Sequence, residues 1–187
     1  MISNEILNAF WTKIAPLQYL VMRNYVDMVS DLNAGGDIDL LVDNKEYFIK
    51  LTGAIPLHDG KDCYNYKVCI KGKEIPIDIR VIGDGYYDTK WEEDMLRRRE
   101  ARDQFYVMEC TDYKYSILYH CLLHKKRITE KYIQTLFREF QTKSVSAMKK
   151  QLVEYMKRYG YNFCRPMDHG VCFNRKQYVE LRLRTLL

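Results

Sequence analysis

Two neighbouring segments with the two-residue hydrophobic repeat of β-strands constrain the fold more than any other feature of the sequence. They are CYNYKVCIK at residues 63–71 and EIPIDIRVI at residues 74–82, joined by Gly72-Lys73. Because side chains alternate between the two faces of a strand, the apolar residues of the second segment share one face: Ile75, Ile77, Ile79 and Val81. The other face carries Glu74, Pro76, Asp78 and Arg80. The short link predicts a β-hairpin, in which Pro76 favours an edge position or a strand start.

Helical and extended patterns alternate in the rest of the chain. Apolar residues at helical spacing, several of them after a capping residue, predict helices over residues 4–15, 44–53, 88–103, 112–127, 130–141 and 144–160. Short apolar runs predict strands over residues 18–23, 37–42 and 104–110. Residues 24–32 fit a helix or a tight connection, and residues 174–187 fit no single type. We therefore expect an α/β (α+β) fold, with a small mixed sheet and flanking helices in residues 1–87 and a helical C-terminal subdomain in residues 88–187 packed on that core.

The composition favours a globular, cytoplasmic protein. Hydrophobic residues make up 47% of the chain and charged residues 29%. No run of about 18 apolar residues occurs, so we expect no transmembrane helix and no membrane partner. The first residues, MISNEILNAFWTKIAPL, lack the basic start and the long apolar core of a signal peptide. We therefore expect reduced thiols at the six cysteines, none of which forms a CxxC pair: Cys63, Cys69, Cys110, Cys121, Cys164 and Cys172.

The net charge of +5 conceals an asymmetry between the two halves of the sequence. Residues 1–94 hold 10 Lys and Arg against 16 Asp and Glu, whereas residues 95–187 hold 20 against 9. An acidic half that binds cations, beside a basic half that binds phosphates, suits an enzyme that acts on nucleotides. The same charges also suit a surface that is simply well solvated, and the charge balance alone does not separate the two interpretations.

Three aspartates are predicted to lie on the polar faces of two strands. Asp37 and Asp39, in NAGGDIDLLVD, are two residues apart and share a face, and Asp78 occupies the polar face of the second hairpin strand. Carboxylates held so close repel each other unless a cation lies between them. Two Mg²⁺ ions held by shared carboxylates neutralise a triphosphate and activate an attacking hydroxyl, so the pattern is typical of nucleotidyl transfer. The alternative is an acidic surface beside a solvated hairpin.

Around these aspartates, the sequence resembles the nucleotidyltransferase superfamily of DNA polymerase beta-like folds. GGDIDLLVD followed by IPIDIRV is similar to its pattern of a glycine turn, an Asp-x-Asp strand and a third acid on a later strand. More narrowly, the chain resembles uncharacterised bacterial and viral nucleotidyltransferase-like proteins, in which LRNY precedes DIDLLVD. Those proteins also carry segments like GDGYYDTKWEEDML and ILYHCLLHK, so the resemblance covers roughly residues 17–126.

The resemblance implies a metal-dependent enzyme that moves a nucleoside monophosphate from a nucleoside triphosphate to an acceptor. A small molecule is favoured as the acceptor, and nucleic acid is possible but not favoured. Asp37, Asp39 and Asp78 would be catalytic and would hold Mg²⁺ or Mn²⁺. The alternatives are an antitoxin-like nucleotidyltransferase that modifies protein or RNA, and a catalytically inactive protein that binds nucleotides.

The residues that would bind the nucleotide depart in part from the superfamily pattern. The superfamily's Gly-Ser pair is replaced here by Arg23-Asn24, which offer a guanidinium and an amide to a phosphate. Gly36, which precedes the aspartate pair, and Arg80, which shares a face with Asp78, are further candidates. Arg80 could instead be an ordinary surface arginine.

The segments GDGYY and HKKR allow more than one interpretation. Asp84 and Tyr86 could form the lip of a cleft or a plain turn. His120 and His124 have a spacing that can hold zinc, but no third ligand is visible in the sequence, so we expect one to pack inside and the other to face the cleft with Lys125. Lys125 is a candidate triphosphate contact, although a helix C-terminus also favours basic residues.

Overall fold

The computed structural model describes residues 1–58 and 64–186, and its centre is a seven-stranded mixed sheet. The strand order is β3-β4-β5-β2-β1-β7-β6. The strands are β1 (Tyr19–Val21), β2 (Ile38–Val42), β3 (Ile55–Pro56), β4 (Asn65–Ile70), β5 (Lys73–Val81), β6 (Glu100–Arg102) and β7 (Phe105–Val107). The expected α/β class is confirmed, with a mixed sheet, flanking helices and a helical C-terminal part.

The predicted hairpin is present as β4 and β5, which pair antiparallel. Its turn lies at Lys71-Gly72, where both residues have positive φ angles of 50° and 72°. Residue 63, at the start of the predicted first strand, lies outside the described residues.

The edge position expected from Pro76 is wrong, because β5 lies between β4 and β2. Pro76 opposes Lys67 of β4, and the pairing of β5 with β2 begins only at Ile77. The N–H that proline lacks is therefore not needed by the ladder to β2.

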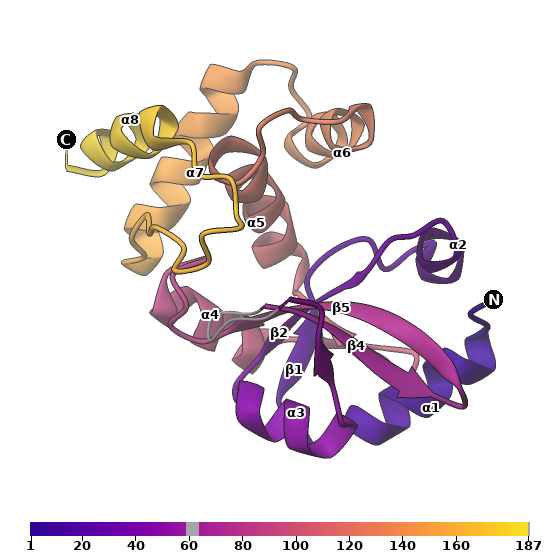
Figure 1. The fold of residues 1–187 in the computed structure, drawn as a ribbon. Coiled ribbons are helices and arrows are strands. Elements are labelled where there is room, and N and C mark those ends of the chain that lie inside the picture. Colours follow the sequence, from indigo (N-terminus) through magenta and orange to yellow (C-terminus); the bar gives the residue numbers. More distant parts are fainter. Residues whose placement is uncertain (59–63, 187) are drawn as a thin grey trace.

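Eight helices surround the sheet in the described part of the chain. They are α1 (Asn4–Ile14), α2 (Met28–Asn33), α3 (Lys45–Thr52), α4 (Thr89–Arg98), α5 (Cys110–Leu123), α6 (Glu130–Phe140), α7 (Val145–Tyr159) and α8 (Arg175–Leu186). In Figure 1, α1 and α3 lie below the sheet, and α5 to α8 gather above it. None of the helices in residues 1–58 and 64–186 is long and apolar enough to cross a membrane.

Two helix boundaries follow local chemistry as predicted. Asn44 caps α3 by accepting a hydrogen bond from the Tyr47 N–H at 2.8 Å, and Gly53 ends the helix with a left-handed φ of 69°. Ser144 caps α7 in the same way. Ser3 occupies the N-cap position of α1, but its side chain makes no capping hydrogen bond.

Three expectations for the second half of the chain need correction. The predicted helix over residues 88–103 ends at Arg98, and Glu100–Arg102 form strand β6 at the edge of the sheet. The helix predicted over residues 112–127, for which the sequence favours Thr111 as the cap, begins at Cys110 and is capped by Glu109, because the Glu109 carboxylate accepts from the backbone N–H groups of Thr111 and Asp112. Helix α5 ends at Leu123, so the HKKR segment is not helical.

The sheet does not stop at the predicted boundary between the two parts of the chain. Strands β6 and β7 come from residues 100–107, within the part predicted as a helical subdomain. The predicted strand over residues 104–110 is present as β7, which pairs parallel with β1. The division at residue 87 therefore stays a prediction. The described sheet contains strands from before this residue, β1 to β5, and from after it, β6 and β7.

Each face of the sheet has its own apolar core. One core packs α1 and α3 against the side that carries Leu40, Ile77 and Ile79. The other packs α4, α5, α7 and α8 against the side that carries Leu20 and Leu41. Because Asp39 alternates with Leu40 along β2, its side chain lies on the face that meets the helical part.

Candidate functional site

Strands β2 and β5 bring the predicted acidic residues together. These strands pair parallel, with Asp39 directly opposite Asp78 and with Ile38 opposite Ile77. Asp37 lies one residue before β2 and two before Asp39, so it extends the same face. Three carboxylates separated by up to 41 positions in the sequence therefore meet where the pairing of β2 with β5 begins.

Two buried arginines pair with two of these carboxylates. Arg23, two residues after the end of β1, donates from Nη2 to Asp39 Oδ1. Both side chains are 6% exposed. Arg80 Nη2 donates to Asp78 Oδ2 at 3.0 Å and lies 2.9 Å from Oδ1. Arg80 is thus a tether for Asp78 rather than the surface arginine that the sequence also allowed.

Burial and mutual repulsion disfavour the ionised form of all three acids. Burial raises the pKa of Asp39 and of Asp78, and in each case the paired arginine opposes that rise while a neighbouring aspartate adds to it. The pKa of Asp37, the most exposed of the three, is also raised, by burial and by the charge of Asp78. The repulsion expected from the sequence is therefore present among the three carboxylates.

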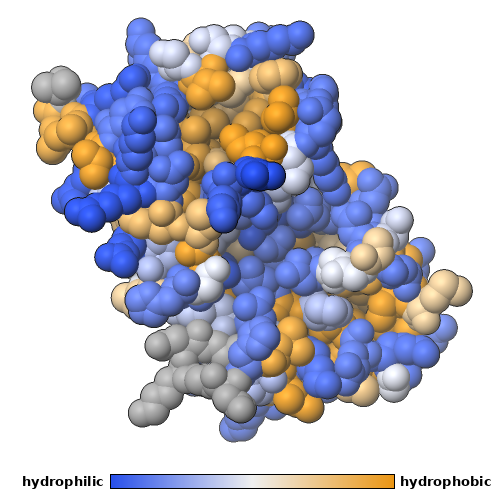
Figure 2. All heavy atoms as spheres, turned by 45° about the horizontal axis from the view of Figure 1, so that its top comes forward, coloured by the Kyte–Doolittle hydropathy of each residue, from blue (hydrophilic) through white to orange (hydrophobic). Residues whose placement is uncertain are grey.

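The carboxylates lie in a pocket of about 440 Å³ between the sheet and the helical part. Seven of the eight predicted site residues line it: Arg23, Asn24, Asp37, Asp39, Asp78, Arg80 and Lys125. Figure 2 shows hydrophilic residues across the middle of the visible face, between areas where apolar side chains reach the surface.

Gly36 is the predicted residue that does not line this pocket. It borders a smaller hollow of about 290 Å³, which shares Asn24, Asp37 and Lys125 with the pocket. Its N–H donates to Asp31 O at 2.9 Å, and a Cβ at this position would lie 2.8 Å from the same oxygen. The close approach explains the glycine, and it leaves the Gly36 N–H already engaged rather than facing a phosphate.

The turn after β5 and helix α5 contribute a wall of aromatic and imidazole groups. Tyr86, predicted as a lip or turn residue, is 2% exposed and forms the inner wall between Arg23 and Arg80, whose guanidinium carbons lie 5.7 and 4.6 Å from its ring centre. His120 and His124 both line the pocket and are each 4% exposed. The expectation that one histidine packs away from the cleft is therefore wrong.

Asp84, the other candidate in the GDGYY segment, stabilises the turn after β5. Its carboxylate accepts from the backbone N–H groups of Val81 at 3.2 Å and Tyr86 at 2.8 Å. These bonds hold the turn after β5 and so fix where Tyr86 points. The turn interpretation of Asp84 is the one that fits the structure.

Asp168 is a site residue that the sequence did not suggest. It lies in the connection between α7 and α8, lines the pocket, and accepts from Arg80 Nη1 at 2.8 Å. The connection is docked by the Met167 N–H, which donates to Asp84 O at 2.8 Å. Arg80 thus links an aspartate of β5 to one of the C-terminal part. The sequence around Asp168 has no periodic pattern, so only the folded chain reveals the pairing.

Unpaired buried polar atoms single out this pocket from the others. Eight side-chain nitrogen and oxygen atoms in the described residues are buried without a hydrogen-bond partner, and six of them belong to residues that line it. They are Arg23 Nη1, Asp78 Oδ1, Arg80 Nε, His120 Nε2, His124 Nδ1 and His124 Nε2. Since buried polar groups are nearly always satisfied, such a cluster is typical of a place that receives a polar ligand.

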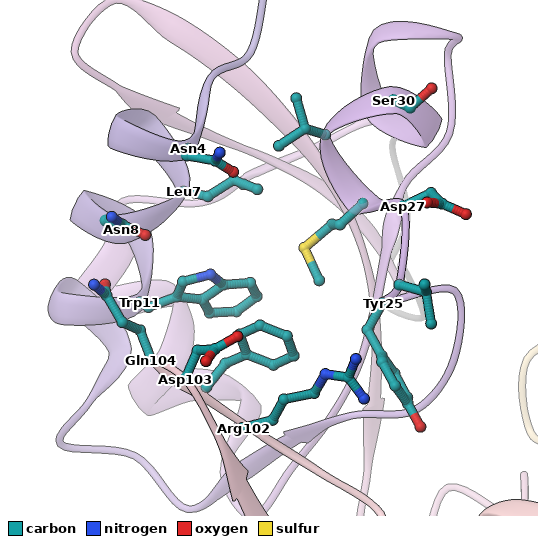
Figure 3. Close-up of a pocket in the computed structure, with 14 residues that line it drawn as sticks. Asn4, Leu7, Asn8, Trp11, Tyr25, Asp27, Ser30, Arg102, Asp103 and Gln104 are labelled. Atoms are coloured by element: carbon teal, nitrogen blue, oxygen red, sulfur yellow. The ribbon is translucent and has the colours of Figure 1, made fainter.

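A larger cavity of about 740 Å³ lies elsewhere, between α1, the β1–α2 loop and the β6–β7 hairpin. Figure 3 shows Trp11 and Leu7 on one side of it, Tyr25 and Asp27 on the other, and Arg102 at its edge. None of the unpaired buried atoms found in the described residues belongs to its lining. We therefore regard the smaller, acidic pocket as the candidate active site.

The carboxylate oxygens of the pocket are ligands of the kind that a hard divalent cation takes. Mg²⁺ takes oxygen ligands and uses few from the protein, and Asp78 Oδ1 accepts no hydrogen bond, although it lies 2.9 Å from Arg80 Nη2 in the ion pair. However, no group of three or more His, Cys, Asp or Glu side chains within residues 1–58 and 64–186 is already arranged around a single ion position. Two of the three carboxylates are instead held by guanidinium groups.

No protein-family model, curated protein or solved structure matches the chain.

Proposed function

We propose that the chain is a metal-dependent nucleotidyltransferase, which moves a nucleoside monophosphate from a nucleoside triphosphate to an acceptor, with a small molecule as the favoured acceptor. The observation that carries the proposal is the in-register pair of Asp39 and Asp78, extended by Asp37, in a pocket lined also by residues with unpaired N–H donors. A cation-binding side and a phosphate-binding side in one cavity suit a metal–triphosphate complex.

Asp37, Asp39 and Asp78 would hold Mg²⁺ or Mn²⁺. When bound, such ions neutralise the triphosphate and lower the pKa of the attacking hydroxyl. The remaining steps belong to the protein. Asp78 would also accept the proton of the acceptor hydroxyl, the role of a general base placed beside the reacting group.

The two buried arginines can bind a phosphate without leaving their aspartates. Arg23 holds Asp39 through Nη2, and its Nη1 is buried without a partner. Arg80 holds Asp78 and Asp168 through its two terminal nitrogens, and its Nε is also unpaired. Each guanidinium therefore positions a carboxylate while it keeps a further N–H for a phosphate oxygen.

Lys125 lines the same pocket and would be the triphosphate contact that the sequence suggested. It lines both the acidic pocket and the adjoining hollow, and its Nζ lies 5.6 Å from the ring centre of Tyr132. As a point charge on a flexible stem, it would bind the more exposed part of a triphosphate. Asn24, with a left-handed φ of 58°, lines the same two hollows.

A second candidate, a catalytically inactive nucleotide-binding protein, is favoured by the ion pairs themselves. Arg23 and Arg80 engage two carboxylates that a metal would need. If these pairs keep the metal from the carboxylates when a triphosphate binds, the pocket would bind the nucleotide without the arrangement for transfer. The use of the same site on a protein or RNA acceptor remains the third possibility.

The experiment compares nucleotide binding with pyrophosphate release. Wild type, Asp39→Asn and Asp78→Asn are titrated with a nucleoside triphosphate and Mn²⁺ by calorimetry, and pyrophosphate is measured beside a panel of acceptors. Asp39→Asn should lose both binding and release. Asp78→Asn should keep much of the binding and lose about 100-fold of the rate, the scale of a missing general base.

Asp43→Asn is the matched control for this experiment, because Asp43 follows the other end of β2 and is exposed. It should leave both measurements unchanged. Binding by wild type without pyrophosphate release on any acceptor would favour the inactive binder. Label transferred from a radioactive triphosphate to a protein or RNA in cell extract would favour the modifying enzyme.

A further inference from the structure

The inner wall of the acidic pocket contains two histidines that no salt bridge or metal explains. His120 lies in α5 and His124 directly follows its last residue. Both are 4% exposed, and both line the pocket. In the described residues, His120 Nε2 and both ring nitrogens of His124 have no hydrogen-bond partner. Unpaired buried polar atoms cost free energy. A ligand that accepts hydrogen bonds from these ring nitrogens would therefore be favoured here.

The hydrogen bond to Tyr86 fixes which nitrogen of His120 carries its proton. Tyr86 Oη lies 2.6 Å from His120 Nδ1. If the phenol donates, both of these atoms are satisfied and Nε2 must carry the N–H of the neutral ring. If Nδ1 donated instead, the phenolic proton would need another acceptor, and His120 Nδ1 is the one hydrogen-bond partner of Tyr86 Oη found within residues 1–58 and 64–186. This accounting assigns the proton to Nε2, which therefore offers a donor to the pocket.

The surrounding charges keep both histidines neutral. Burial lowers the pKa of His120 and of His124, and the positive charges of Arg23 and Arg80 lower them further. Lys125 has the same effect on His120. A neutral imidazole always carries one N–H, so His124 also has a buried donor without an acceptor, whichever nitrogen holds the proton.

The wall as a whole therefore offers donors. Arg23 Nη1 and Arg80 Nε are unpaired beside the two histidines, and Tyr86 packs between these groups, with its ring centre 4.2 Å from that of His124. A ligand that satisfies these donors carries several acceptor oxygens, and hydrogen bonds to charged acceptors are the stronger ones. A polyphosphate has both features, whereas an apolar group has neither.

We propose that His120 and His124 form a polyphosphate subsite, in which their neutral ring N–H groups donate to the β- and γ-phosphates of the triphosphate. The proposal rests on the proposed function for the placement of these phosphates. Transfer takes place at the α-phosphorus beside Asp39 and Asp78, so the rest of the chain of phosphates extends away from the carboxylates. Tyr86 is a positioning residue, since it acts through the His120 ring.

The test is binding of inorganic tripolyphosphate with Mg²⁺ to the full chain by calorimetry. Wild type should bind, because the subsite needs no nucleoside. His120→Leu and His124→Leu should each lose about tenfold or more in affinity, the scale of one hydrogen bond to a charged group. His120→Gln places an amide N–H near the position of Nε2 and should restore most of the lost affinity. His58→Gln, at an exposed histidine, is the matched control and should bind like wild type.

Nuclear magnetic resonance of the imidazole nitrogens in the wild-type protein tests the same proposal without a variant, so it still applies if a leucine variant fails to fold. His120 should show its proton on Nε2, and tripolyphosphate should shift the Nε2–H signals of the pocket. Tyr86→Phe should mix the two tautomers of His120. A signal that places the proton on Nδ1, or that does not move with ligand, overturns the proposal.

The outcomes also separate this proposal from the proposed function. Histidine-dependent tripolyphosphate binding without pyrophosphate release from any nucleotide keeps the subsite and removes the enzyme. Nucleotide turnover with unchanged affinity in the folded histidine variants keeps the enzyme and removes the subsite. Absence of tripolyphosphate binding to wild type, under conditions in which the nucleotide binds, also removes the subsite.

Discussion

Replacing Arg23 by leucine tests whether the ion pair beneath the candidate site is as buried as the structure indicates. The guanidinium is 6% exposed, as is the side chain of its partner Asp39. Leucine fills part of the space and removes the charge, so the variant leaves a buried carboxylate with Asp37 as its neighbour and no cation bonded to it. Removal of one partner of a buried pair costs about 3–5 kcal/mol, because the other charge is left uncompensated.

The expected loss in melting temperature follows from the size of the chain. For domains of 150–250 residues, about 1 kcal/mol corresponds to roughly 2–4 °C, so Arg23→Leu should melt about 6–20 °C below wild type. Arg97→Leu is the matched control. Arg97 pairs with Asp94, but its side chain is 71% exposed, so its loss should cost at most about 1 kcal/mol.

The cost of Arg23→Leu should depend on pH in a defined direction. Burial already raises the pKa of Asp39, and loss of Arg23 raises it further. The native state then holds a proton that the unfolded state has released, so stability falls as the pH rises above the unfolded pKa of about 4. The variant should therefore be closest to wild type near pH 4 to 5 and furthest from it near pH 8.

Urea unfolding, followed by tryptophan fluorescence at pH 5 and pH 8, measures this cost. The double variant Arg23→Leu/Asp39→Asn should be more stable at pH 8 than Arg23→Leu alone, because the asparagine amide leaves no uncompensated charge in the interior. Equal costs at the two pH values, together with additive effects of the two substitutions, would refute the argument that Asp39 is a buried charge held by Arg23.

Two further predictions concern the ligand and the backbone. Mn²⁺ with a nucleoside triphosphate, at about 100 times the dissociation constant, should stabilise the protein by about 2.7 kcal/mol; an equal thermal shift by triphosphate with a chelator would contradict a metal role. Gly85→Ala should destabilise the fold more than Gly53→Ala in urea unfolding. Both glycines have positive φ angles, of 75° and 69°, but only at Gly85 would the new Cβ clash with a backbone atom, the carbonyl oxygen of Arg165. Comparable losses of stability would show that the connection carrying Asp168 does not depend on this contact.

The parts of the fold that the sequence predicted are those in which local chemistry agrees with the tertiary structure. The β4–β5 hairpin has a strict two-residue repeat and a turn with two positive φ angles. Strand β6 was missed because Glu100–Arg102 carry no apolar alternation and are all exposed, so pairing with β7 alone makes them a strand. The cap of α5 was missed because Glu109 is an unusual N-cap residue, although its carboxylate accepts two backbone N–H groups.

The candidate site divides in the same way. Alternation along each strand placed Asp37 with Asp39 and Asp78 with Arg80, because that relation needs only two residues of one strand. The register that sets Asp39 opposite Asp78 joins two parallel strands across a long crossover, and no local pattern encodes it. Asp168 depends on a connection without periodicity, which is positioned by backbone contacts to the turn after β5.

The charge of the pocket explains why a metal and a triphosphate should enter it together. Its lining holds four aspartates and four basic residues: Asp37, Asp39, Asp78, Asp168, Arg23, Arg80, Lys125 and Lys126. A bare triphosphate would add several negative charges to a balanced site, beside carboxylates that already repel one another. A bare divalent cation would have to compete with guanidinium groups that are bonded to two of those carboxylates. Under the proposed function, a metal–triphosphate complex would reduce both costs, because its cation would meet the carboxylates while its phosphate oxygens would meet the unpaired donors of the arginines and histidines. The groups that form the ion pairs of the pocket would then also be the groups that bind the ligand.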